Sequence, residues 1–153
     1  MKTLVLAVIL FFPCAGFAQT VLVSPAASYG TAIPDNIKEC ALEQLQSEAV
    51  VKELNAAGIT AQAGSSDAVP AKGRYLQLKI ESAISGGNAF TGHRKQVTTS
   101  AKLFKNGKEV AQTTKSRDSS GGMWAGYKGS CSVLRRCVTV LGKDIAAWAK
   151  TQP

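Results

Sequence analysis

Strict alternation of apolar and polar side chains over residues 75–81 is the feature that most constrains this chain. The segment reads YLQLKIE, so Leu76, Leu78 and Ile80 share one face and the intervening polar residues share the other. A strand with a single apolar face belongs to a sheet that is covered on one side only. We therefore predict a half-buried sheet as the framework of the fold.

Two further strands follow in the sequence. Residues 97–103 alternate again, and Asn106-Gly107 then precedes the apolar pair Val110-Ala111. Asn and Gly accept the positive φ angles of a type I′ turn, which makes this dipeptide a strong hairpin signal. These patterns predict three consecutive antiparallel strands.

Two segments have the composition and spacing of helices. Residues 36–57 are rich in helix-forming residues, with Asp35 placed as the N-cap and Gly58 as the C-terminal stop. Residues 132–150 form the second helix. The apolar residues of the first are Ile37, Ala41, Leu42, Leu45, Ala49, Val51 and Leu54. The apolar stripe of the second comprises Val133, Leu134, Cys137, Val138, Leu141, Ile145 and Trp148, with Arg136, Lys143 and Lys150 opposite.

The remaining strands are short and flank the first helix. Residues 20–24 and 59–63 are rich in β-branched and small apolar residues, and a strand, a helix and a strand in this order form a parallel βαβ unit. The chain of 153 residues suits one domain. We predict an α+β fold of order β-α-β-β-β-β-α, with a mixed, mostly antiparallel sheet and two helices packed on one face.

The first eighteen residues have the pattern of a signal peptide. Lys2 precedes an apolar run over residues 3–12, which is too short to span a bilayer, and Pro13 then breaks it. Cleavage after Ala18 would leave residues 19–153 as a single periplasmic domain. No later stretch reaches 18 consecutive apolar residues, so we expect no transmembrane segment after removal of the signal peptide.

Cys14 raises the alternative of a lipoprotein, which is cleaved directly before a lipid-bearing cysteine. Such signals have an aliphatic residue three positions before the cysteine and a small residue directly before it. Here Phe11 and Pro13 occupy these positions. We therefore expect no lipid anchor at Cys14.

The exported chain would retain Cys40, Cys131 and Cys137, which predicts one disulfide and one free thiol in an oxidising compartment. Cys131 and Cys137 point away from each other if both are helical, so we place Cys131 just before the helix. We favour a Cys40–Cys131 bridge with Cys137 in the core, and other pairings remain open. Without a Cys-x-x-Cys motif or a second histidine beside His93, we expect no metal ion and no other cofactor.

Charge is divided unevenly along the chain. Residues 19–89 hold five Lys or Arg and seven Asp or Glu, whereas residues 90–153 hold twelve and three. The basic half would attract an anionic envelope component or an acidic periplasmic protein. The alternative is that the lysines protect a strand edge from aggregation. Nucleic acid is disfavoured, because export removes the usual targets and no nucleic-acid-binding motif is present.

Two loops concentrate candidate binding residues. Residues 86–95 hold His93 with Arg94 and Lys95, and residues 119–130 place Met123, Trp124, Tyr127 and Lys128 among four glycines. Aromatic side chains on such a loop either fold back onto the core or present a recognition tip. The predicted binding residues are Arg94, Lys95, Trp124, Tyr127 and Lys128.

The segments PDNIKECALEQL, GNAFTGHRK and GSCSVLRRCVTVLGKDIAAWAK, together with the signal peptide, resemble small exported proteobacterial proteins of uncharacterised function. The order of elements is similar to periplasmic domains of envelope-assembly lipoproteins and to the N-terminal domain of TolB. This resemblance concerns architecture and implies no functional residues.

The sequence is compatible with three functions. The first is a periplasmic, non-enzymatic binding or envelope accessory module that acts through the basic C-terminal half and the glycine-rich aromatic loop. The second is a periplasmic inhibitor or immunity protein directed against a toxin or lytic enzyme. The third is a hydrolase that uses His93, which would need a carboxylate within hydrogen-bond reach in a deep cleft.

Overall fold

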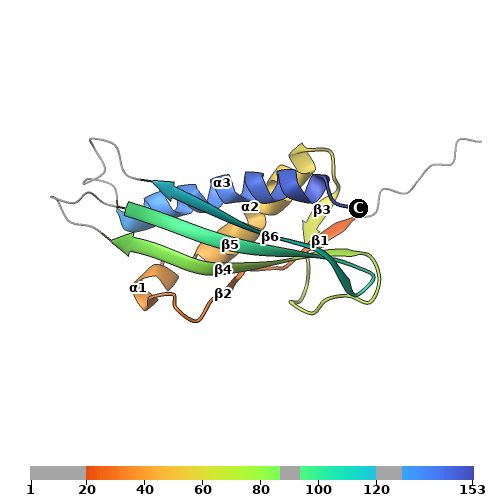
Figure 1. The fold of residues 1–153 in the computed structure, drawn as a ribbon, viewed down its shortest axis with the longest axis horizontal. Coiled ribbons are helices and arrows are strands. Elements are labelled where there is room, and N and C mark those ends of the chain that lie inside the picture. Colours follow the sequence, from red (N-terminus) through yellow and green to blue (C-terminus); the bar gives the residue numbers. More distant parts are fainter. Residues whose placement is uncertain (1–19, 87–93, 120–128) are drawn as a thin grey trace, which may run out of the picture.

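The computed structural model describes residues 20–86, 94–119 and 129–153, which form a single domain with one sheet and two long helices (Figure 1). In chain order the elements are β1 (Val21–Val23), β2 (Ser28–Tyr29), α1 (Asp35–Lys38), α2 (Leu42–Ala56), β3 (Ala61–Ala63), β4 (Arg74–Gly86), β5 (Arg94–Lys105), β6 (Lys108–Ser119) and α3 (Ser130–Lys150). The predicted α+β class is confirmed. The predicted signal peptide, His93, Trp124, Tyr127 and Lys128 lie outside the described residues.

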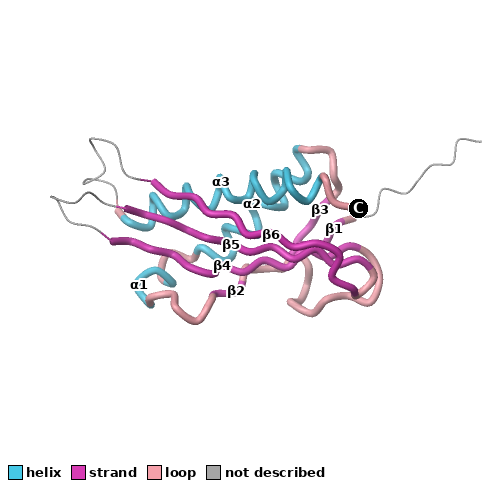
Figure 2. The backbone as a smooth tube through the Cα atoms, viewed as in Figure 1, coloured by secondary structure: helices cyan, strands magenta, loops and turns pink. Residues whose placement is uncertain are grey.

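The sheet is mixed, as the sequence predicts (Figure 2). Its strand order is β3-β1-β4-β5-β6, with β2 also paired to β4. The short strands β1, β2 and β3 make parallel pairs, whereas β4, β5 and β6 form a long antiparallel meander. Helices α2 and α3 lie side by side over one face (Figure 1).

The alternation in β4 puts its apolar side chains where the sequence predicts. Leu76, Leu78 and Ile80 are fully buried under the helices. A β-bulge then shifts the register between Ile80 and Ser82, so that Ala83 becomes the next buried residue. The strict alternation therefore ends at the bulge although the strand continues to Gly86.

The predicted hairpin between β5 and β6 is confirmed in its backbone conformation. Asn106 and Gly107 have φ angles of 52° and 78°, as a tight turn of this kind needs. The Asn106 backbone N–H donates to the Gly73 carbonyl at 2.8 Å, and the Gly73 N–H donates to Asn106 Oδ1 at 3.0 Å. Asn106 thus also fastens the turn to the loop before β4.

The predicted first helix is wrong in one respect, because it is broken. Helix α1 ends at Lys38, and Ala41 then adopts a left-handed φ of 49° before α2 begins at Leu42. Helix propensity is a weak preference that tertiary contacts override. Here the break lets Ile37 and Leu42 both reach the core.

Other details of this region also differ from expectation. Asp35 is the first residue of α1 and pairs with Lys38, so Pro34 takes the N-cap position that we predicted for Asp35. Strand β2 at Ser28–Tyr29 is an additional strand that the sequence patterns do not predict. The stop at Gly58 is confirmed by its φ of +80°, which favours glycine.

The cysteines pair as favoured. Cys40 and Cys131 form a disulfide that joins the break between α1 and α2 to the start of α3. Cys131 lies in the first turn of α3, not before it as predicted, because the helix begins at Ser130. Cys137 is a free, buried thiol, and burial raises its pKa, so the thiol stays protonated and behaves as a small apolar side chain.

Candidate functional site

The described part of the basic half has a surplus of unpaired positive charge at its surface. Two of its three acids are already neutralised, because Glu109 binds Lys102 at 2.9 Å and Asp144 binds Arg117. The exposed cations of β5, β6 and α3 are Arg94, Lys105, Lys108, Arg117, Arg135, Arg136, Lys143 and Lys150. The charge asymmetry of the sequence is therefore present on the folded surface.

A groove lies between the outer edge of the sheet and α3, and we refer to it as the edge groove. Among the described strands, β6 lies at the end of the sheet and pairs with β5 alone, so no described strand pairs with its other edge (Figure 1). The groove has a volume of about 450 Å³. It is lined by Lys115, Ser116 and Arg117 of β6, by Asp144, Ala147 and Trp148 of α3, and by Thr151.

Arg117 and Asp144 form a two-pronged ion pair across this groove. Arg117 Nε lies 2.6 Å from Asp144 Oδ2, and Arg117 Nη2 lies 2.6 Å from Oδ1. These hydrogen bonds raise the pKa of Arg117 above its ordinary value. The Arg117 side chain is 48% exposed, so the pair orients the guanidinium without removing it from solvent.

Lys143 precedes Asp144 in the sequence, but it is not the ion-pair partner of this carboxylate. Adjacent residues of a helix point in directions about 100° apart, so their side chains do not face each other. Asp144 points toward β6, where the alternation of the strand puts Arg117 on the helix side. The partner is 27 positions away in the sequence, which no local pattern reveals.

Two of the predicted binding residues lie within the described part of the chain. Arg94 is exposed, whereas Lys95 is only 8% exposed and its Nζ donates to Ser85 Oγ at 2.7 Å. Successive residues of a strand point to opposite faces of the sheet, so these two cations do not form one binding surface. Their binding role stays a prediction, as do those of Trp124, Tyr127 and Lys128.

Sequence reasoning missed the edge groove. The helical pattern predicts only a place in the apolar stripe for Trp148, and no sequence motif points to Lys115 or Arg117. The alternation of Thr113, Lys115 and Arg117 along one side of the last strand was the available signal. This alternation could not reveal the groove, because the sequence does not show which strand forms the edge of the sheet.

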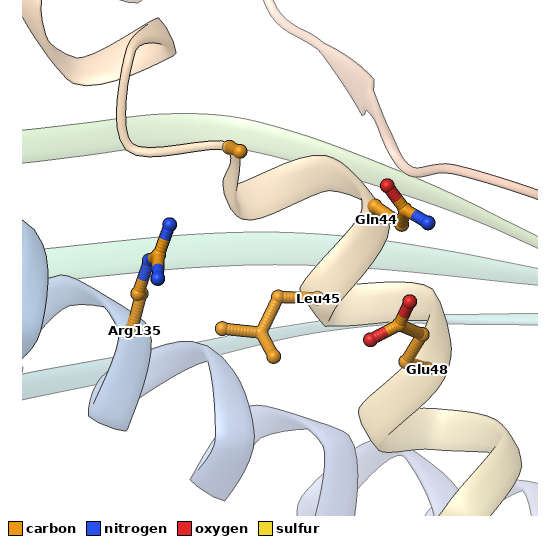
Figure 3. Close-up of a pocket in the computed structure, with 5 residues that line it drawn as sticks. Gln44, Leu45, Glu48 and Arg135 are labelled. Atoms are coloured by element: carbon orange, nitrogen blue, oxygen red, sulfur yellow. The ribbon is translucent and has the colours of Figure 1, made fainter.

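A second, smaller hollow lies between α2 and the first part of α3 (Figure 3). Its volume is about 250 Å³, and it is lined by Ala41, Gln44, Leu45, Glu48 and Arg135. Arg135 Nε donates to the Cys40 carbonyl at 3.0 Å, which ties this guanidinium to the corner that the disulfide also holds. Arg135 thus contributes to holding the corner between α1 and α2 against the start of α3.

The described residues provide neither a metal centre nor a membrane span. Within residues 20–86, 94–119 and 129–153, no three His, Cys, Asp or Glu side chains come together in a way that could hold a metal ion. In the same ranges, no helix combines the length and the apolar character needed to cross a bilayer.

Comparison with known proteins gives matches in structure but not in sequence. No protein-family model matches the chain, and no curated sequence matches it significantly. A Xanthomonas campestris protein described by the family model DUF330 is similar with a TM-score of 0.59 and 14% identity, covering 86% of this chain and 83% of its own. The PelC dodecamer from Paraburkholderia phytofirmans has a TM-score of 0.50 and 16% identity, with coverages of 86% and 91%.

A third similar structure is the lipoprotein GNA1162 from Neisseria meningitidis, with a TM-score of 0.49, 16% identity and coverages of 84% and 99%. At their low identities, the matches to the Xanthomonas and Paraburkholderia structures show a common fold and no more. The expected resemblance to uncharacterised proteobacterial proteins is thereby confirmed at the level of architecture.

Proposed function

We propose that this protein is an exported, non-enzymatic binding module of the bacterial envelope, which recognises an acidic protein or another anionic envelope component through its basic half. The observation that carries the proposal is the surplus of exposed cations on β5, β6 and α3 after two of three local acids have been paired. The positive electrostatic field of these cations attracts anionic partners and speeds their association.

The predicted signal peptide supports an envelope role, because it would direct this chain out of the cytoplasm. The proposal rests on the charge surplus of this chain and takes nothing from the similar structures.

Charge reversal tests the proposal directly. The double variant Lys115→Glu, Lys143→Glu changes one cation that lines the edge groove and one exposed cation of α3, whereas Lys52→Glu changes an exposed cation on α2 in the acidic half. Each protein is expressed from the full-length sequence and crosslinked in the envelope. The captured partner is then identified, and its affinity is measured with purified components at low and high salt.

We expect one acidic partner whose binding weakens with salt and with the double variant but not with Lys52→Glu. Equal binding by the unmodified protein, the double variant and Lys52→Glu would overturn the proposal. A stoichiometric complex that inhibits a lytic enzyme would instead favour the inhibitor interpretation.

A further inference from the structure

The edge groove has a geometry that charge alone does not explain. We infer that it binds an extended acidic segment of a partner protein, which pairs with the free edge of β6 as an additional strand. The inference rests on the proposed function, because it specifies the class of partner and the place where that partner binds. It adds a backbone-mediated mode of recognition to a general electrostatic one.

The outer edge of β6 offers backbone groups for pairing. The strand is twelve residues long, and within residues 20–86, 94–119 and 129–153 it pairs with β5 only, so alternate N–H and C=O groups along its outer edge have no strand partner there. The opposite edge of the sheet is β3, which has only three residues. Long free edges readily accept an added strand, and several peptide-binding domains use this mode.

Helix α3 offers a small-residue and aromatic surface beside the outer edge of β6. Ala147 is exposed and small, and Trp148 beside it is half-buried, so the groove offers both room and an aromatic surface. Val140, seven residues before Ala147, is 43% exposed on the same side of α3. Apolar side chains of an added strand could pack on this surface while its backbone pairs with β6.

Two cations of β6 at the edge groove favour an acidic segment as its occupant. Lys115 makes none of the ion pairs formed by the described residues, and the Arg117 guanidinium is held in place by Asp144 while half-exposed. These side chains lie on the groove side of β6, so the carboxylates of an added strand would lie within their reach. Lysines that merely protected an edge from aggregation would need no hollow and no aromatic surface beside them.

A second copy of this chain is a less suitable occupant. Its acidic half carries Glu43, Glu48 and Glu53 on helix α2, where they cannot be presented as an extended strand. The acid in the long strands of that half is Glu81, and it is already paired with Lys79 at 2.8 Å. Within the described residues, the chain therefore lacks an extended acidic segment that would complement its own groove.

The test uses a synthetic peptide that alternates glutamate with valine. Two derivatives carry N-methyl groups on alternate amides, one on the odd and one on the even positions. Only one set of amides faces β6 in an added strand, because hydrogen-bonding groups alternate along it. We expect one derivative to bind at least about tenfold more weakly and the other to bind within about twofold of the parent peptide.

A variant of the protein gives an independent measurement. Ala147→Arg fills the groove with a cationic side chain, whereas Ala56→Arg adds the same charge at an exposed position at the end of α2. If attraction is purely electrostatic, both variants bind the peptide more tightly. We expect Ala147→Arg to bind at least about tenfold more weakly and Ala56→Arg to bind no more weakly than the unmodified protein.

The outcomes separate the inference from the proposed function. Equal loss with both N-methylated peptides, no binding of the parent peptide, or tighter binding by Ala147→Arg would overturn strand addition. The proposed function would stand in each of these cases if the variant Lys115→Glu, Lys143→Glu loses its envelope partner. Self-association that Ala147→Arg abolishes, with no peptide bound, would identify a second copy as the occupant and would also overturn the inference.

Discussion

The hydroxyl of Tyr29 donates a hydrogen bond to Oε2 of Glu43 at 2.8 Å, and this contact joins β2 to the first turn of α2. The Tyr29 hydroxyl oxygen in turn accepts a hydrogen bond from the backbone N–H of Leu42 at 3.3 Å. Ala41 holds the N-cap position of α2 and has no side-chain oxygen to cap the helix. Tyr29 therefore satisfies from another element one of the donors that helix starts leave free.

Replacing this hydroxyl should destabilise the protein measurably. We expect Tyr29→Phe to lower the free energy of unfolding by about 1 kcal/mol, because it removes a cap and leaves the Glu43 carboxylate without its donor. Urea denaturation followed by circular dichroism measures the change. Ser28→Ala, an exposed neighbour on β2, is the control and should have little effect. Indistinguishable midpoints for Tyr29→Phe and Ser28→Ala would contradict the capping role.

The same contact predicts a loss of stability at high pH. Burial, and then the hydrogen bond to Glu43, raise the pKa of Tyr29 to about 12 from an ordinary value of 10.0. Between these two values the folded state binds more protons than the unfolded state, so its stability falls as the pH rises through this window. Unfolding midpoints measured across the window should fall more steeply for the unmodified protein than for Tyr29→Phe. Parallel curves would show that Tyr29 does not contribute.

Removal of the disulfide should have the largest effect on stability. Cys40 and Cys131 are 91 positions apart, and closing a loop of this length lowers the entropy of the unfolded chain. We expect the double variant Cys40→Ser, Cys131→Ser to lose about 4 kcal/mol, as measured by urea unfolding. Addition of a reductant should destabilise the unmodified protein but not this double variant. A reductant effect on the double variant would show that another bridge forms.

The contact between α2 and α3 makes the effect of a glycine substitution predictable. A Cβ at Gly142 would lie 2.6 Å from the Cβ of Ala49. Alanine favours a helix over glycine by about 1 kcal/mol, but overpacking costs about 1 to 3 kcal/mol, so we expect Gly142→Ala to destabilise. Ala49→Gly should recover part of this loss in a double-mutant cycle. An increase in the unfolding midpoint on Gly142→Ala alone would refute the close packing.

Export gives a prediction that needs no structural variant. We expect protein purified from cells that express the full-length sequence to begin at Gln19, after removal of the signal peptide. Intact mass spectrometry and N-terminal sequencing measure this directly. A chain that begins at Cys14 with added lipid mass would instead identify a lipoprotein. A chain that begins at Met1 would argue against export.

The sequence by itself determined the features that depend on short segments of chain. Alternation over residues 75–81 and 97–103 predicted two long strands, and Asn106-Gly107 predicted the turn that precedes the third. The helical stripe that contains Leu134 and Leu141 predicted α3 and its buried face. Such features are predictable because side-chain periodicity and backbone sterics act between residues that are close along the chain.

The tertiary structure alone decided the features that make the edge groove. It put β6 at the edge of the sheet, brought Arg117 to Asp144 and turned Trp148 toward the groove. It also broke the first helix at Ala41, where the disulfide and the core require a corner. These outcomes depend on contacts between residues that are far apart in the sequence. Their free energies are not contained in any local segment, so the edge groove could be found only after the fold was known.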